Sequence, residues 1–304
     1  MQRSRHAAVP RWWTSAADAG ACRTEGALAV KNTVVSAPWI SLLGSFSCGA
    51  EHPFELPPAG ERLLAFLALQ RHPVARHRVA GVLWPEVPEP RALASLRSTI
   101  WKLRRSADPI VEVRDDRLSL APSVVVDTDD FSDRSLRIID DAPIDLRGLR
   151  TASFGAELLP DWYDDWVVFE RERLRQLALH ALEALSRRYL AAEQYAKAIE
   201  AAVVAVSLEP LRESAHTCLI DAHLAEGNLS EALGRFRAYT VLLEGELGVA
   251  PSDRLIDRLD EHVRRARARC DRVTAWSGDD ALGDRLRRDV RPARETPREV
   301  QHHG

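Results

Sequence analysis

The sequence predicts a mainly α protein with small β elements in its N-terminal half, and three observations support this fold class. Extended segments, three helical segments and a hairpin pattern follow one another over residues 38–126. Beyond residue 124 the hydrophobic periodicity is mostly helical, and part of it repeats. Charge is also unevenly distributed. Residues 60–105 hold nine basic and three acidic side chains, whereas residues 115–165 hold five basic and 13 acidic ones.

The composition predicts a soluble, cytoplasmic protein whose 304 residues are enough for two domains. Basic and acidic residues number 42 and 45, so a nucleic-acid-binding surface has to be sought in local charge. The four cysteines lie far apart without CxxC spacing, which argues against a zinc site or a disulfide framework. No apolar run approaches the ~18 residues that span a bilayer, and we expect no membrane association.

The two ends of the chain lack a hydrophobic period. Residues 1–37 predict a flexible N-terminal extension, and residues 271–304 predict a flexible C-terminal tail. The tail contains His302 and His303, but two ligands without a third partner do not indicate a metal site. We therefore expect no metal and no other cofactor.

The N-terminal region has the element order of a winged helix-turn-helix domain over residues 38–126. Apolar alternation predicts its strands, and the 3.6-residue period together with Pro85, Pro88 and Pro90 delimits its helices. The expected elements are a strand at 39–47, an extended piece at 53–56, helices at 60–70, 76–84 and 91–106, and a hairpin of 110–113 with 117–120.

The second region, residues 127–270, contains a repeat with the period of a tetratricopeptide helix pair. Residues 189–199 resemble residues 223–233, and the offset is 34 residues throughout. Glu209 and Pro210 end one unit, because proline cannot continue a helix. Two units are too few for a stable stack, so we expect the segment 129–178 to supply further helices.

The third helix of the N-terminal region is amphipathic. Leu93, Leu96, Thr99, Ile100 and Leu103 share one side and would be buried. Between residues 91 and 105 there are five positive charges and no acid. The opposite side and its flanks carry Arg91, Ser95, Arg97, Ser98, Trp101, Lys102, Arg104 and Arg105.

Such a helix can enter the major groove of DNA, where Arg and Lys donate to guanine and Ser serves a base or a phosphate. Arg114 and Arg117 of the hairpin could lie along the sugar-phosphate backbone, although Asp115 and Asp116 at its tip oppose close approach. An ordinary solvated arginine-rich helix is the alternative interpretation. Trp101 is equally compatible with packing and with a DNA contact.

Three stretches resemble the SARP family (Streptomyces antibiotic regulatory proteins), whose plan is an OmpR-type winged helix followed by a bacterial transcriptional activator domain. The first joins RHRVAGVLWPE at 76–86 to SLRSTIWKLRR at 95–105. The second runs from Arg117 to Phe131. The third comprises ELLPDWYDDW at 157–166, PLRESAH at 210–216 and ELGVAPS at 246–252.

The resemblance implies DNA contacts by the third helix. Base-facing positions are Arg91, Ser95, Ser98 and Lys102, and phosphate-facing positions are Arg97, Arg104 and Arg105. It also implies that the loop 84–90 touches RNA polymerase holoenzyme, with a sigma factor facing Trp84, Glu86 and Glu89. Ala75 departs from the family, because a helix-capping Ser or Thr is usual there.

The predicted function is a sequence-specific transcriptional activator that binds double-stranded DNA at a direct-repeat operator. Self-association on DNA would then be head to tail, since a two-fold dimer suits a palindrome. By resemblance, the regulated genes belong to secondary metabolite (antibiotic) biosynthesis. The alternative is a helical-repeat interaction scaffold or a ligand-sensing regulator that does not act on promoters directly.

An enzyme is not expected, because the sequence lacks His-Glu-x-x-His, Gly-x-Ser-x-Gly and G-x-x-x-x-G-K-[ST] motifs. The acidic cluster Asp161, Asp164 and Asp165 could suggest catalysis or metal binding. Its place before a long helix favours a structural role, since negative charge there favours the helix dipole.

Overall fold

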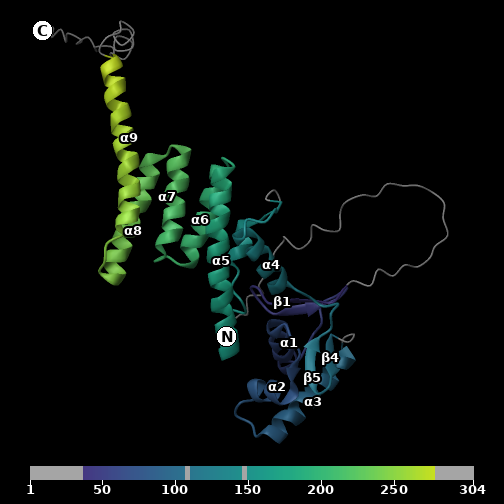
Figure 1. Cartoon of the computed structure of the whole chain (residues 1–304). Helices are drawn as coiled ribbons and strands as arrows, with labels where there is room; N and C mark the ends of the chain where they lie inside the picture. The colour runs from purple at the N-terminus through teal and green to yellow at the C-terminus, as the bar shows by residue number, and fades with distance from the viewer. Residues whose placement is uncertain (1–36, 107–109, 146–148, 278–304) are drawn as a thin grey trace, which may run out of the picture. The chain divides into compact units, whose positions relative to one another are not determined.

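The computed structural model describes residues 37–106, 110–145 and 149–277 (Figure 1). Short strands are confined to the N-terminal part of these residues and helices make up most of the rest, which confirms the mainly α fold class. No helix among the described residues is long and apolar enough to cross a membrane. The predicted N-terminal extension lies outside them up to Ser36.

The first sheet joins the two ends of the winged-helix region. Strand β1 (Trp39–Ser41) pairs antiparallel with β2 (Ser47–Gly49) and parallel with β6 (Val125–Val126), in the order β2-β1-β6. The prediction of one strand over residues 39–47 is therefore wrong. The chain turns at Gly44, whose φ of 88° lies in the left-handed region that glycine adopts without strain.

Three helices follow and form the core of the winged helix. They are α1 (Pro58–Gln70), α2 (Arg76–Leu83) and α3 (Glu89–Ser106), each within two residues of its predicted bounds. The predicted extended piece at 53–56 is reduced to a bridge between Gly49 and Pro53. The side chains predicted to point inward from α1 are buried, namely Leu63, Leu64, Phe66, Leu67 and Leu69.

The second sheet carries the predicted hairpin, which is the wing. Strands β4 (Val111–Arg114) and β5 (Arg117–Leu120) pair antiparallel, and β3 (Val74–Ala75) adds to the other edge of β5 in the order β3-β5-β4. Asp115 and Asp116 form the two-residue turn with φ values of 45° and 62°. Positive φ at both central residues is typical of a tight hairpin turn.

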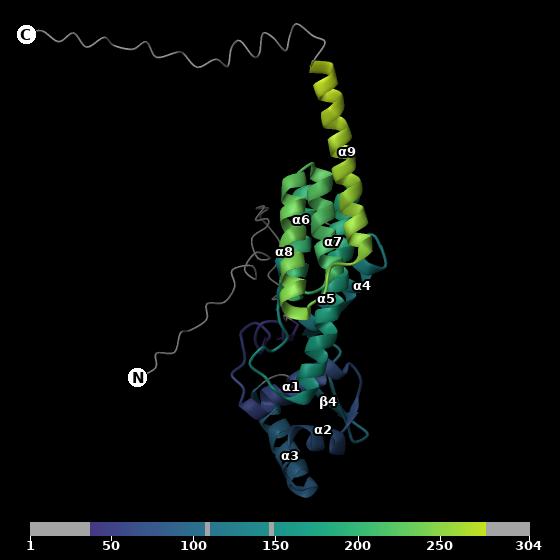
Figure 2. The same ribbon diagram turned by 90° about the vertical axis from the view of Figure 1, so that its left-hand side faces the viewer.

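The second region begins with α4 (Asp127–Ile139) and the 3₁₀ helix η2 (Thr151–Gly155). Four long helices follow, α5 (Asp165–Ala191), α6 (Tyr195–Leu208), α7 (Glu213–Glu226) and α8 (Leu229–Leu247). Each packs against the next in the series (Figures 1 and 2). α9 (Asp253–Ser277) completes the described chain.

The helices reproduce the sequence repeat. The second helix of each pair starts at Tyr195 and at Leu229, which is the predicted offset of 34 residues. Ala198, Ala202 and Ala232 are fully buried, as the close approach of paired helices requires. The helical structure also continues through α9 to Ser277, past the predicted start of a flexible tail at residue 271. His302 and His303 lie outside the described residues.

A continuous hydrophobic core joins the winged helix to the first helices of the second region. Phe66 of α1 packs edge-to-face against Trp166 of α5, with ring centroids 5.4 Å apart. Phe46 stacks on Trp162 at 5.9 Å. Arg62 of α1 forms an ion pair with Asp164 just before α5. Apolar packing and a partly buried ion pair therefore tie the two regions together.

Asp127 is the polar centre of the junction between β1 and α4. Its carboxylate accepts hydrogen bonds from the backbone N–H groups of Leu42 and Leu43 at 2.9 and 3.0 Å and from the Ser41 hydroxyl at 2.7 Å. Burial raises the pKa of Asp127, and these donors oppose the shift. Asp127 therefore satisfies the backbone N–H groups of Leu42 and Leu43 that follow β1.

Two buried histidines lie two turns apart on α7. His216 stacks on Tyr239 of α8, with ring centroids 4.1 Å apart, and one ring nitrogen is 2.8 Å from the Pro210 carbonyl oxygen. His223 is 8% exposed, and neither of its ring nitrogens has a hydrogen-bond partner among the described residues. Burial lowers the pKa of both rings from 6.5. For both, the nearby Arg235 adds to this effect, and the neighbouring carboxylates of Glu213, Glu226 and Glu231 oppose it.

We expect the stability of this repeat to fall as the pH is lowered through 6.5. A histidine whose pKa is lowered by folding binds its proton first in the unfolded state, so acid shifts the equilibrium toward unfolding. His223→Leu removes one such group and an unpaired buried ring. Between pH 7.5 and pH 5.5, the melting temperature of the variant, measured by circular dichroism, should fall less than that of the wild type. An identical loss in both proteins would contradict the assignment.

Candidate nucleic-acid interface

Helix α3 is positioned by its apolar side. The N–H groups of Arg91 and Ala92 donate to the Pro88 carbonyl at 2.9 and 3.1 Å, which starts the helix after the loop. The stripe that packs inward is Ala92, Leu96, Thr99, Ile100 and Leu103. The Thr99 hydroxyl donates a hydrogen bond to the Ser95 carbonyl at 2.9 Å, which satisfies this buried group within the helix. Leu93, predicted in this stripe, is only half-buried.

The close approach of α3 to α1 depends on Gly60. A Cβ atom at this position would lie 3.2 Å from Cδ2 of Leu103, which is tighter than ordinary packing. Glycine therefore allows α1 and α3 to cross near their backbones. Together with the other buried side chains of the stripe, this contact holds the apolar side of α3 inward, so the basic side faces outward.

The outward side of α3 carries the residues that the sequence assigns to DNA. Ser95 is half-buried, whereas the other assigned side chains are exposed, namely Arg91, Arg97, Ser98, Lys102, Arg104 and Arg105. The only acidic residue of α3, Glu89, lies in its first turn. The structure thus brings the seven assigned side chains onto one helix. Beyond its first turn, this helix carries basic residues and no acidic residue.

Trp101 lies on this exposed face. Its side chain is 57% exposed, and the Arg105 guanidinium carbon stands 4.8 Å from the ring centroid. The stacking is a cation–π contact that holds Arg105 along the helix. Of the two interpretations left open by the sequence, packing under a neighbouring element is excluded among the described residues. The indole is available to a partner together with the arginine.

The wing is less strongly cationic than its sequence implies. Arg114 is 79% exposed at the side chain, but it forms an ion pair with Glu112 at 2.9 Å. Arg117 donates to the Pro73 carbonyl at 3.1 Å. Asp116 pairs with Arg76 at 3.3 Å, which partly offsets the acid at the tip. The local charges nearly cancel, so α3 rather than the wing supplies most of the positive potential.

A basic hollow next to the wing was missed by the sequence argument. It lies between β3, the start of α2 and β5, and its polar lining is His72, His77, Arg78 and Arg117. No side chain caps α2, because Ala75 stands at the N-cap. The signal in the sequence was the run of three Arg and two His over residues 71–78, which the assignment of DNA contacts to α3 and the wing left out.

The loop between α2 and α3 divides into a packed residue and exposed ones. Trp84 is half-buried against the core, and its N–H donates to the Ala80 carbonyl at 3.0 Å. Glu86 and Glu89 are exposed. The two carboxylates are therefore accessible to a basic partner, whereas the Trp84 ring contributes mainly to packing.

The acidic cluster before α5 has structural partners. Asp164 pairs with Arg62, and its carbonyl accepts the N–H groups of Val167 and Val168 that open the helix. Asp161 and Asp165 are exposed. No group of three potential metal ligands occurs in the part of the chain that the structure describes.

These features define a class of protein: a winged helix with an exposed basic helix, joined through one core to a helical-repeat domain. Residues 148–272 match the family model of the bacterial transcriptional activator domain. The chain therefore carries this domain behind its winged helix. This is the plan of SARP-type transcriptional regulators, and it confirms the resemblance drawn from the sequence.

A solved structure supports the same fold. Mycobacterium tuberculosis EmbR, in complex with a low-affinity phosphopeptide, superposes with a TM-score of 0.60 at 20% identity. The similarity covers 76% of this chain and 66% of the EmbR chain, so this chain spans just under two thirds of EmbR. At that identity the likeness shows the fold alone. No curated protein matches the chain in sequence.

Proposed function

We propose that the chain is a sequence-specific DNA-binding transcriptional activator. The observation that carries the proposal is the exposed face of α3, which presents Arg, Lys and Ser side chains on a helix whose sequence has no acidic residue beyond its first turn. Positive charge on a bare helix suits the major groove, where phosphates attract it and base edges accept its hydrogen bonds. The activator-domain match supports a regulatory rather than an enzymatic role.

In this proposal the parts of the interface have different tasks. Arg91, Ser95, Ser98 and Lys102 face the bases, while Arg97, Arg104 and Arg105 lie along the phosphates. Arg114 and Arg117 of the wing contact the neighbouring backbone, and the basic hollow extends that contact. Phosphate contacts set the position of the protein and base contacts set its specificity.

The remaining parts of the proposal concern partners. The exposed Glu86 and Glu89 would meet basic residues of a sigma factor in the RNA polymerase holoenzyme. Protomers would lie head to tail on a direct repeat, since a winged helix binds one half-site. The regulated genes would encode the synthesis of a secondary metabolite. The cytoplasm is the compartment in which these partners occur.

The test is selection of duplexes from a random library by the full chain, followed by footprinting and a salt titration. We expect enrichment of a direct repeat whose half-sites are spaced by about one helical turn or a multiple of it. With about five phosphate contacts, the slope of log affinity against log salt should be about −4.5.

Two results would contradict the proposal. One is a library that shows no enrichment after selection. The other is an affinity that does not change between low and physiological salt, because phosphate contacts by arginine necessarily release counterions.

A further inference from the structure

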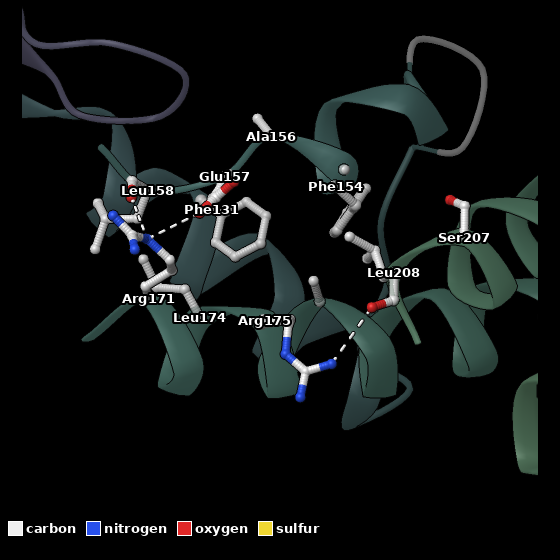
Figure 3. Close-up of a pocket in the computed structure, with 12 residues that line it drawn as sticks. Phe131, Phe154, Ala156, Glu157, Leu158, Arg171, Leu174, Arg175, Ser207 and Leu208 are labelled. Atoms are coloured by element: carbon white, nitrogen blue, oxygen red, sulfur yellow. Dashed lines mark hydrogen bonds and ion pairs between the residues drawn. The ribbon is translucent and has the colours of Figure 1, made fainter. Parts of the chain in front are cut away.

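A cavity of about 340 Å³ lies in the helical domain, away from the proposed DNA surface (Figure 3). Its walls come from α4, η2, the segment after η2, the N-terminal half of α5 and the end of α6. The space is about ten times the ~30 Å³ share of one water molecule in the liquid. It opens to solvent at its rim, where Ser207 of α6 is exposed.

The wall of the cavity is mainly apolar. Phe131 and Phe154 meet there with ring centroids 5.6 Å apart and ring planes at 53°. Leu174, Ala178 and Leu208 line the sides. Aromatic and aliphatic side chains of this kind bury an apolar ligand by excluding water from its surface.

The charged groups of the cavity are already paired. Arg171 donates to the carbonyls of Leu158 and Trp162 at 2.8 and 2.9 Å and pairs with Glu157 at 3.1 Å. Arg175 pairs with Glu172 and Glu209, and it also donates to the Leu208 carbonyl at 3.4 Å, the bond drawn as a dashed line in Figure 3. An anion would have to compete with these carboxylates, and a cation would face both guanidinium groups. The electrostatics therefore favour a neutral molecule.

The same residues also connect the cavity to the winged helix. Leu158, which lines it, forms a β-bridge with Leu43, and the adjacent Leu159 N–H donates to the Leu42 carbonyl at 3.0 Å. Arg171 holds this segment from the side of α5. A molecule in the cavity would thus touch the segment that joins the two regions.

We propose that this cavity binds a small neutral, largely apolar molecule with an aromatic or alicyclic body. Its volume lies at the small end of the about 300–1,000 Å³ found for organic ligand sites. The proposal rests on the helical domain alone and does not depend on DNA binding.

The test uses three naphthalene probes that differ in charge: 2-naphthalenemethanol, 2-naphthoate and 2-naphthylmethylammonium. We expect the full chain to bind the neutral alcohol with a stoichiometry of one in isothermal titration calorimetry. Each ion should bind at least tenfold more weakly. Equal or tighter binding of either ion would overturn the proposal, and so would the absence of binding by all three probes.

Two variants locate the binding. Ala178→Phe fills the cavity from α5, and Ser207→Trp covers it from the exposed rim on α6, where a large side chain has room if the first variant folds poorly. Both variants should bind the neutral alcohol at least tenfold more weakly than the wild type does. Ser230→Trp is the matched control, because Ser230 is exposed on α8 outside the lining, and it should bind as the wild type does.

Unchanged binding by Ser207→Trp and Ala178→Phe would overturn the assignment to this cavity. A duplex-binding measurement on the same variants separates the two proposals. The variants should retain their affinity for DNA. Loss of probe binding with intact DNA binding therefore supports the assignment of the ligand site to this cavity. A chain that binds the probe but no DNA contradicts only the proposed function.

Discussion

Replacing Lys102 and Arg105 by glutamate should abolish duplex binding by the full chain. The double variant changes the charge of the α3 face by four units and leaves an acid where a phosphate or a guanine would lie. Each lost contact costs about 1–3 kcal/mol, and repulsion between the new carboxylates and the phosphates adds to the loss. We expect a decrease in affinity of more than about 100-fold.

Fluorescence anisotropy with the selected duplex measures this effect, and circular dichroism measures the fold. Both side chains are exposed, so melting should change by only a few degrees. Arg237→Glu with Arg254→Glu is the matched control, since these exposed arginines lie on α8 and α9. If the control lost as much affinity as the α3 variant, net charge rather than the α3 face would explain binding.

The second large effect concerns stability. Phe66→Ala should lower the free energy of unfolding by about 3–5 kcal/mol, the usual cost of truncating a buried phenylalanine. Phe66 is 2% exposed and packs against Trp166 across the junction. Because one core spans the winged helix and the start of α5, the loss should appear in a single unfolding transition of residues 37–277.

Urea unfolding followed by tryptophan fluorescence and by far-ultraviolet circular dichroism gives this measurement. Trp166→Phe serves as the comparison, because it keeps an aromatic ring and removes a buried indole N–H that has no hydrogen-bond partner in the part of the chain that the structure describes. Its cost should be far smaller than that of Phe66→Ala. Two well-separated transitions in the wild type, with only the first shifted by Phe66→Ala, would show that the regions unfold independently.

Sequence periodicity predicted the helices well because each of them buries a stripe. In α1 and α3 the apolar positions recur at helical spacing, and the predicted inward residues are largely the buried ones. The repeat offset placed the starts of α6 and α8 correctly, since each is the second helix of a pair and packs against the first in the same way. The prediction of a winged helix with helical repeats therefore rested on local signals alone.

The short strands were predicted less well. Strands β3 and β6 have two residues each, and such a segment has no period to detect. Its extended conformation comes from pairing with β5 or with β1, which lie far away in sequence. The turn at Gly44 likewise divides a run, residues 39–47, whose apolar side chains predicted a single strand.

The candidate site shows the same division. The positive face of α3 follows from residue spacing, whereas the basic hollow forms only where β3 and α2 meet β5. Arg114 and Arg117 looked equally available in the sequence, but Glu112 and the Pro73 carbonyl occupy them in the fold. Distant partners of this kind cannot be inferred from a count of charges.

By itself the sequence determined the helices, their repeat and the side of α3 that carries charge, because each depends on the spacing of side chains along one element. Only the tertiary structure decided how α3 is turned outward, which charges are neutralised, and where the cavity beside Phe131 and Phe154 lies. The physical reason is that these properties depend on contacts between segments far apart in the chain, such as Gly60 with Leu103 and Leu43 with Leu158.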